Sequence, residues 1–393
     1  MKIVFKNRLF NGGSSYSLLE YVKHAKRAGH EVEVWGTLTK EKARYEKAGI
    51  NQLVHFPPFD YKKPWKNLKI LISYINRIQK TKPDLIIDIT FQNSIFTKLA
   101  SKMTGVPSLH LIPGMAVPGF YADVMSPDEL IVFSEENKKE LTAQGYNSSV
   151  IHVFPNRIDF SLYPEPDSYE PPKEKKRFLL VTRMDNEKIN SIWTTFRLVK
   201  ETQEAAGQEV ELTIAGAGAL WEEVKREAEK LQENQKIKVN MLGFIRDVPV
   251  EVKKHDFIAG KGRSVIDGMY LKKPSIVVNE SDHYALVTEE NVQALADYNF
   301  AGRNLSSSDE AHVFSGGEEI NPQALTNIRE FIKDNYSIEQ IHDKLNQIIE
   351  KKGKPNNGVK LNYPAGIVFF ITIYGKIIKY YASRSLKDKL KRK

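Results

Sequence analysis

Glycine, arginine and serine stand together just before a predicted helix in the segment AGKGRSVIDGMYLKKPSIVV, residues 259–278. Gly262 gives the backbone freedom to turn, and Ser264 is a residue type that caps helices. Arg263 adds a cation at the same end, where the first backbone N–H groups of a helix attract anions. The segment therefore predicts an anion-binding corner, although an ordinary loop, helix and strand would have the same pattern.

Strand-like and helix-like segments alternate on both sides of this corner. KIVF at residues 2–5 is a β-branched and apolar run, and a Gly-rich loop, an amphipathic helix and the strand EVEVW follow it. A second series of the same kind begins at RFLLVTRM, residues 177–184. This order is typical of doubly wound α/β domains with parallel sheets. Gly12, Gly13 and Ser14 do not form a GxGxxG fingerprint, so they are either a loop for phosphate or sugar or a tight turn.

The length of the chain favours two domains. A chain of 393 residues exceeds the usual size of a single core. We expect an N-terminal Rossmann-like domain at 1–160 and a C-terminal one at 177–350, facing each other across a cleft. Residues 161–176 are rich in Pro, Tyr, Glu and Lys and lack an apolar period, which is typical of a linker. Residues 351–393 form a basic amphipathic tail.

The positive charge of the chain lies in this tail. The formal net charge is +9, and residues 351–393 hold ten Lys, two Arg and one Asp, which is +11, so the rest carries 9 − 11 = −2. A near-neutral body argues against a nucleic-acid-binding domain. There is no cysteine, and the apolar run at the N-terminus is too short for a signal peptide, so we expect a cytoplasmic protein.

The tail itself contains PAGIVFFITIYGKIIKYYA, residues 364–382. Its uninterrupted apolar part is about half as long as a helix that spans a bilayer. Apolar and basic residues together are typical of segments that lie on an anionic membrane surface. The alternative is a C-terminal helix that packs back onto the body.

Several motifs occur in one order: GG after the first strand, VFPNRID, VTRM followed by EK, ELTIAGAG, LGF and GRSVIDGMYLKKP. This ordered set resembles the retaining nucleotide-sugar glycosyltransferases of glycosyltransferase family 4, over about residues 1–345. The resemblance implies the GT-B fold. It also implies that the donor lies mainly on the C-terminal domain and the acceptor mainly on the N-terminal domain.

The resemblance also implies roles for individual residues. Arg183 and Lys188 stand where the family places a basic pair on the donor diphosphate. Asp267 stands where a carboxylate accepts hydrogen bonds from the donor ribose. The first carboxylate of that paired motif should stand eight residues earlier, where this sequence has Ala259. This departure concerns the group that normally contacts the transferred sugar.

The remaining donor-binding candidates are loop residues. Gly243 and Phe244 match the position where the backbone meets the nucleobase, and they are equally typical of a strand end. Gly262, Arg263 and Ser264 are expected to hold phosphate. Gly12, Gly13 and Ser14 are further donor-binding candidates.

His283 follows a predicted strand end and is a candidate for sugar contacts. No His, Asp or Glu cluster has metal-ligand spacing, so we expect no metal and no cofactor beyond the nucleotide-sugar itself. No P-loop or nucleophile elbow is present, and the N-terminal domain offers no clear general base.

The sequence thus predicts a retaining hexosyltransferase that moves a sugar from a UDP-sugar to a glycan or a lipid-linked acceptor, in the synthesis of cell-surface polysaccharide or glycoconjugate. We expect it at the inner face of the cell membrane, with no nucleic-acid partner. One alternative is a non-catalytic GT-B protein that binds glycan or supports a partner transferase. A nucleotide-sugar epimerase on the same fold is the other.

Overall fold

The computed structural model describes most of the chain. It leaves out residues 10–11, 39–41, 61–62, 90–93, 113–128, 173, 308, 310–319, 354–360, 363, 365–366, 369, 373, 377 and 380–393. The side chains of residues 8–9 and 12–17 are not described either.

Contacts divide the chain into two compact units. The first unit contains residues 1–154 and 342–393, and the second contains residues 155–341. This division differs from the boundaries expected from the sequence, because residues 155–176 group with the second unit and the chain returns to the first unit at His342.

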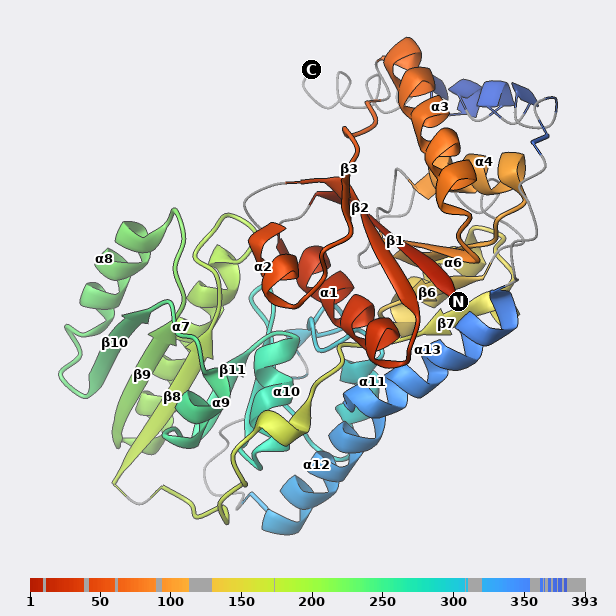
Figure 1. The fold of residues 1–393 in the computed structure, drawn as a ribbon. Coiled ribbons are helices and arrows are strands. Elements are labelled where there is room, and N and C mark those ends of the chain that lie inside the picture. Colours follow the sequence, from red (N-terminus) through yellow and green to blue (C-terminus); the bar gives the residue numbers. More distant parts are fainter. Residues whose placement is uncertain are drawn as a thin grey trace. The chain divides into compact units, whose positions relative to one another are not determined.

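The first unit contains a parallel sheet of seven strands, in the order β3-β2-β1-β4-β5-β6-β7 (Figure 1). The strands are β1 Lys2–Leu9, β2 Glu31–Thr37, β3 Leu53–His55, β4 Leu85–Asp88, β5 Ser108–Ile112, β6 Leu130–Val132 and β7 Ile151–Val153. Strands β4, β5 and β6 are buried at every position, as expected for parallel strands covered on both faces. The helices between them are α1 Gly12–Arg27, α2 Lys42–Lys47, α3 Pro64–Thr81, α4 Ser94–Thr104 and α6 Glu135–Ala143. Helices α3 and α4 share one apolar cluster with β1 and β4.

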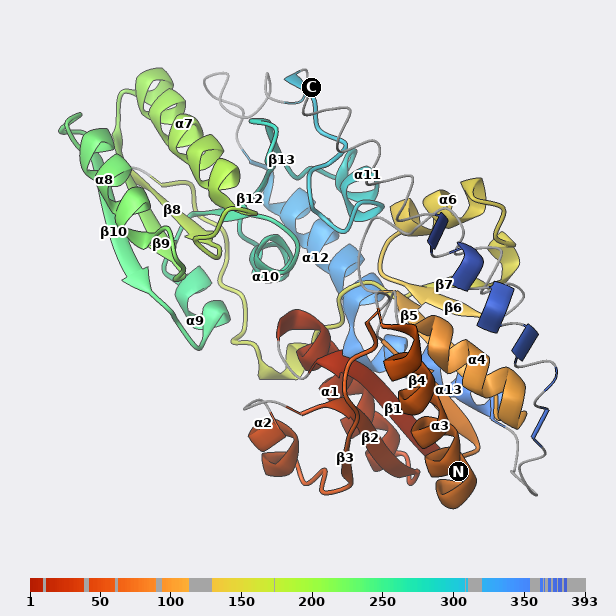
Figure 2. The same cartoon turned by 90° about the horizontal axis from the view of Figure 1, so that it is seen from above.

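The second unit contains a sheet of six strands, in the order β10-β9-β8-β11-β12-β13. The strands are β8 Lys175–Val181, β9 Glu209–Ala215, β10 Ile237–Gly243, β11 Phe257–Gly260, β12 Ser275–Val278 and β13 Tyr284–Leu286, and only β13 runs antiparallel to its neighbour. The helices are α7 Ile189–Ala206, α8 Trp221–Leu231, α9 Val248–Lys253, α10 Arg263–Tyr270, α11 Val292–Ala296 and α12 Pro322–Tyr336. Figure 2 shows α7 and α8 on one face of this sheet and α9 and α10 on the other, and each pair packs into its own apolar cluster. The predicted α/β fold with two Rossmann-like units is therefore confirmed.

Helix α13, Ile338–Lys352, begins at the end of the second unit and continues in the first. The break between α12 and α13 is held by Ile158, whose N–H donates to Tyr336 O at 2.8 Å and whose carbonyl accepts from Ile338 N at 2.9 Å. Near its end, Lys351 lies 3.1 Å from the buried carboxylate of Glu129. Burial alone would raise the pKa of Glu129, but Lys351, Lys352 and His152 outweigh burial and lower it. This carboxylate therefore keeps its charge and fastens the end of α13.

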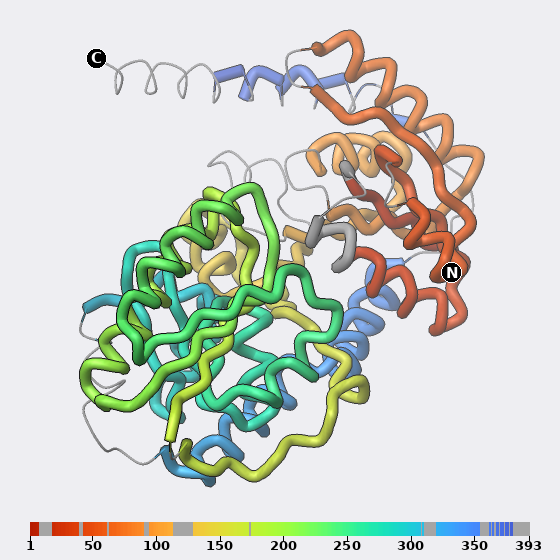
Figure 3. The backbone as a smooth tube through the Cα atoms, turned by 90° about the vertical axis from the view of Figure 1, so that its left-hand side faces the viewer, coloured from red at the N-terminus to blue at the C-terminus, as the bar shows by residue number. Residues whose placement is uncertain are grey.

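Beyond α13, the described residues between 364 and 379 are helical and lie beside α3 at the edge of the first unit (Figure 3). Tyr374 is buried in the apolar cluster of α3 and α4, and Phe370 packs against that cluster. One side of the tail helix therefore packs onto the first unit. This agrees with the alternative given above, a C-terminal helix that packs back onto the body. Among the described residues, no helix is long and apolar enough to cross a membrane.

Candidate functional site

Five strands of the second sheet end at one edge, and the loops that follow them carry the predicted site residues. Strands β8, β9, β10, β11 and β12 are mutually parallel, so their carboxyl ends lie together. Ligands of open α/β sheets bind outside this edge. The loops begin at Thr182, Gly216, Phe244, Lys261 and Asn279.

Two of these loops lie in direct contact, and glycine makes the contact possible. The N–H of Met184 donates to Ala217 O at 3.2 Å, and the N–H of Leu220 donates to Met184 O at 3.0 Å. A Cβ atom on Gly216 would lie 1.7 Å from Thr182 O, and one on Gly218 would lie 2.1 Å from Met184 O. The AGAG sequence after β9 therefore fixes the position of the loop that carries Arg183.

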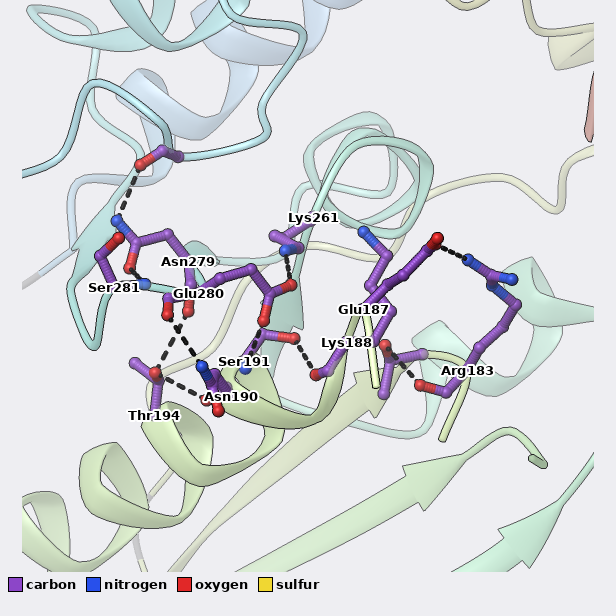
Figure 4. Close-up of polar contacts among 12 residues, drawn as sticks. Arg183, Glu187, Lys188, Asn190, Ser191, Thr194, Lys261, Asn279, Glu280 and Ser281 are labelled. Carbon is purple, nitrogen blue, oxygen red and sulfur yellow. Dashed lines mark hydrogen bonds and ion pairs between the residues drawn. The ribbon is translucent and has the colours of Figure 1, made fainter. Parts of the chain in front are cut away.

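The two cations expected for the diphosphate differ in their surroundings. Arg183 is 64% exposed at its side chain and pairs with Asp185 at 2.9 Å and Glu187 at 3.1 Å. Lys188 is the N-cap residue of α7, and its side chain makes no capping hydrogen bond. Figure 4 shows Lys188 next to the first turn of α7, with Arg183 on the loop before it.

An ion pair that the sequence did not predict lies at the same helix end. Lys261, directly after β11, pairs with Glu280, the second residue after β12 (Figure 4). The second carboxylate oxygen of Glu280 accepts the N–H of Ser191 in the first turn of α7 at 3.0 Å. A carboxylate of the chain itself thus occupies the positive end of the α7 dipole, where anions are stabilised.

The Lys261 ammonium is largely shielded from water, since its side chain is only 13% exposed. Burial lowers its pKa, the hydrogen bond to Glu280 raises it, and the charge of Lys188 lowers it again. Two lysines close enough to affect one another, together with a helix N-terminus, form an electropositive region that a phosphate group would suit.

Asn279 fixes the loop that carries Glu280. Its side-chain oxygen accepts the N–H groups of Ser281 and His283, both at 2.8 Å, and its amide donates to Gly302 O at 2.9 Å. His283 therefore lies in the turn between β12 and β13, four residues after Asn279. The structure places it at the same sheet edge as Glu280.

Asp267 lies in the first turns of α10 and is almost fully buried. It accepts hydrogen bonds from the hydroxyl of Tyr163 and from Nε of Arg263, the latter at 2.8 Å. Burial raises the pKa of Asp267, and the charge of Arg263 counteracts part of that rise. In this structure Asp267 and Arg263 therefore bind each other and Tyr163, which was not a predicted site residue.

The small residues at the start of α10 make backbone contacts. Gly262 has a φ of 59°, a region that favours glycine, and its N–H donates to Phe300 O at 2.8 Å. The hydroxyl of Ser264 is buried and donates to Lys261 O at 3.3 Å. Ala259 is fully buried in the apolar cluster under α7, so its methyl group offers no polar contact.

Gly243 and Phe244 end β10 at the same edge. Gly243 has a φ of 71°, and its carbonyl accepts the N–H of Gly216 at 2.7 Å. The Phe244 ring is 77% exposed. A planar base could stack on a ring presented in this way.

In the first unit, Gly12, Gly13 and Ser14 form the first turn of α1, and the side chain of Ser14 is outside the described residues. A small cavity of about 20 Å³ opens beside Lys6, Asn7 and Phe59. Lys6 is buried and pairs with Asp88 at 2.9 Å. Among the described residues, no group of His, Cys, Asp or Glu could hold a metal ion.

Comparison with protein families gives one match. Residues 11–162 match the model described as Glycosyltransferase Family 4. The resemblance to glycosyltransferase family 4 is confirmed. The matched segment begins after β1, runs from α1 through β7 and ends before β8, so the donor-site candidates of the second unit lie outside it.

Solved structures of similar fold extend over the rest of the chain. A glycosyltransferase from Rickettsia africae has a TM-score of 0.66 at 16% identity, and 89% of this chain covers 98% of it. HepE of Anabaena, solved in complex with UDP, has a TM-score of 0.63 at 14% identity, with 89% and 100% covered. WaaB, a lipopolysaccharide outer core galactosyltransferase, has a TM-score of 0.60 at 16% identity, with 89% and 100% covered. A search of curated proteins gives no match.

At these identities the structural similarity establishes the fold, and the chain has the two Rossmann-like units of GT-B proteins. Family 4 similarity in the first unit and a GT-B second unit agree with the order of motifs in the sequence. Lys261 and Glu280 were missed because they are 19 positions apart. Both, however, lie within two residues of the ends of neighbouring strands, and the rule that ligands bind at strand carboxyl ends points to both.

Proposed function

We propose that the chain is a retaining glycosyltransferase that moves a hexosyl group from a UDP-sugar to a glycan or lipid-linked acceptor in the synthesis of cell-surface polysaccharide or glycoconjugate. The observation that carries the proposal is the pair of lysines, Lys188 and Lys261, beside the α7 N-terminus at the carboxyl edge of the second sheet. The UDP complex of HepE, a protein of the same fold, favours UDP as the nucleotide. Retention rests on the resemblance to family 4.

The chemistry requires positive charge at this place. When the bond between the sugar and the diphosphate breaks, negative charge accumulates on the leaving diphosphate. Cations and helix dipoles that are already in position stabilise that charge more than they stabilise the ground state. Lys188 and Lys261 would contact the diphosphate, and Arg183 would add a third cation once it leaves its acidic neighbours. The leaving phosphate can accept the acceptor proton, so a strong general base is not required.

A thermal-shift screen with UDP, UDP-sugars and other nucleotides tests donor binding. We expect UDP to raise the melting temperature, and Lys188→Met to weaken its affinity by about tenfold to a hundredfold. A charge-assisted hydrogen bond contributes on the order of 1.5–3 kcal/mol, which corresponds to that range. Arg183→Ala should also reduce the shift. Lys200→Met, three turns further along α7, is the matched control and should leave the affinity unchanged. No shift with any nucleotide would refute the proposal.

A non-catalytic GT-B protein is a second candidate, favoured by two observations. Ala259 supplies no carboxylate, and Asp267 is bound to Tyr163 and Arg263. This candidate predicts UDP binding without turnover, and activity only after a partner transferase is added. A nucleotide-sugar epimerase would instead change the sugar in the absence of acceptor. Product analysis after incubation with donor alone and with donor plus acceptor separates the three.

The proposal includes a peripheral position at the inner face of the cell membrane, because a lipid-linked acceptor would be found there. No nucleic-acid partner and no cofactor beyond the nucleotide-sugar form part of it.

A further inference from the structure

The tail helix is fixed to the first unit at two described points. At its start, the N–H of Asn362 donates to Met103 O at the end of α4, at 2.9 Å. Further along, the amide of Asn67 in α3 donates to the hydroxyl of Tyr374. The Tyr374 ring also lies 6.3 Å from that of Phe96 in α4, in an edge-on arrangement. These contacts determine which side of the helix faces the body.

Four aliphatic residues of this helix do not face the body. Ile367, Val368, Ile371 and Ile378 are between 57% and 66% exposed. At 100° per residue they fall within one arc of about 100°, next to the arc of Phe370 and Tyr374. We call this arc the tail face. Four adjacent exposed aliphatic side chains on one helix are uncommon in a monomer and indicate an interaction surface.

The charge around the tail face is predominantly positive; the acid near Tyr374 is Asp60, which pairs with Lys63. Helices α3 and α4 and residues 364–379 contain eight Lys or Arg and no Asp or Glu. Lys66 and Lys69 are exposed on the α3 turns that flank Asn67, and Lys379 is exposed on the tail helix. By contrast, α8 alone contains four Glu in eleven residues. An apolar arc among mostly basic side chains is complementary to an anionic surface with an apolar layer beneath it.

We propose that the tail face docks the first unit onto a bilayer that contains anionic lipids. This deepens the proposed function by naming the surface that would hold the enzyme next to a lipid-linked acceptor. The aliphatic side chains would enter the boundary between headgroups and acyl chains, and the surrounding lysines would contact anionic headgroups. A second copy of the chain is the weaker occupant, because a symmetric contact would bring two predominantly basic surfaces together.

Co-sedimentation of the full chain with lipid vesicles tests the proposal. We expect binding to vesicles of phosphatidylcholine mixed with phosphatidylglycerol, and weaker binding to phosphatidylcholine alone. The double variant Ile367→Ser/Ile371→Ser should bind at least about tenfold more weakly, because two exposed apolar side chains no longer enter the lipid. Leu162→Ser, at a still more exposed position in the second unit, is the control and should bind as the wild type does.

Three outcomes would overturn the proposal: no vesicle binding by the wild type, equal binding by the double variant, or a dimer in sedimentation analysis that the double variant dissociates. The last outcome would assign the tail face to a second copy. The UDP-induced thermal shift of the double variant should equal that of the wild type, because the substitutions lie outside the second unit. If UDP did not raise the melting temperature of the wild type, the proposed function would be refuted. The vesicle-binding result would not be affected.

Discussion

At the scale of single residues, Glu280 changes how the donor site is understood. The motif that would place a carboxylate at position 259 has alanine there, and the methyl group is buried. Glu280 brings a carboxylate to the same sheet edge from the end of β12, where it binds Lys261 and the N–H of Ser191. Without a ligand, Glu280 therefore neutralises the Lys261 ammonium and the N-terminus of α7. A bound diphosphate would need these same positive groups.

Neutralising Glu280 should strengthen nucleotide binding. Glu280→Gln keeps the size of the side chain and removes one negative charge beside Lys261. We expect the affinity for UDP to rise by about tenfold. The charge of Glu280 no longer competes with the phosphates for Lys261, and a tenfold change corresponds to roughly 1.4 kcal/mol. Lys261→Met should lower the affinity by a similar factor. Titration calorimetry at low salt measures both.

Glu204→Gln, an exposed acid further along α7, is the control for this pair of variants and should have no effect. If Glu280→Gln and Lys261→Met weakened binding equally, the pair would act by holding the loops in place. The role of Glu280 as a competitor would then be wrong.

Single residues also mark the limit of prediction from sequence. Arg183 and Lys188 could be named as candidates because the VTRM and EK motifs match the family pattern along the sequence. Tyr163 was not found, because it is distant in sequence from Asp267, and only the fold brings its hydroxyl to that carboxylate. Hydrogen bonds between segments so far apart leave no local pattern.

At the scale of elements, the loop between β9 and α8 depends on its glycines. A Cβ on Gly218 would lie 2.1 Å from the carbonyl oxygen of Met184. Gly218→Ala should therefore push the loop of Arg183 away and destabilise the fold by about 1–3 kcal/mol, as overpacking does. Urea unfolding measures the loss, and UDP affinity should fall in parallel.

Gly375→Ala is the matched control for this loop, since a Cβ there meets no atom within 4 Å. Because Gly375 lies in a helix, alanine there should keep the stability or raise it by up to about 1 kcal/mol, and it should leave the UDP affinity unchanged. An alanine tolerated at position 218 on both measures would mean that the two loops can separate without consequence for the site.

The existence of most elements followed from local sequence, but their ends did not. The alternation of β-branched strands and amphipathic helices predicted the doubly wound units, because buried parallel strands require continuous apolar runs. Helices α12 and α13, for example, are separated at Ser337, where Ile158 bonds to the residues on both sides. An apolar stripe on a helix indicates that this side of the helix is buried. It does not identify the segment of the chain that packs against it.

At the scale of the whole molecule, the chain crosses from the first unit to the second near residue 154 and back near residue 341. The sequence predicted two Rossmann-like domains. It could not predict that the chain returns to the first unit at His342, because contacts such as those of Phe370 and Tyr374 with the cluster of α3 and α4 join segments far apart in the sequence. The tail thus belongs to the unit that the family resemblance associates with the acceptor.

If the donor binds the second unit alone, amide hydrogen exchange with and without UDP should show protection in that unit only. Saturating UDP should slow exchange at residues 182–191, 243–246, 259–264 and 279–283, which are loops and first helical turns at the carboxyl edge of the second sheet. Such loops open at low free energy, so a bound ligand protects them strongly. At a concentration one hundred times Kd, the added stability is about 2.7 kcal/mol.

Strands β1 to β7 provide the internal reference, because their amides should exchange at the same rate with and without UDP. Lys188→Met should remove the protection at equal UDP concentration, which links the effect to the α7 N-terminus. Protection confined to the first unit would place the nucleotide site on the wrong sheet and refute the assignment of Lys188, Lys261 and Glu280 together. Protection at 182–191 and 259–264 without any at 243–246 would retain the phosphate site and exclude Phe244 as the surface for the base.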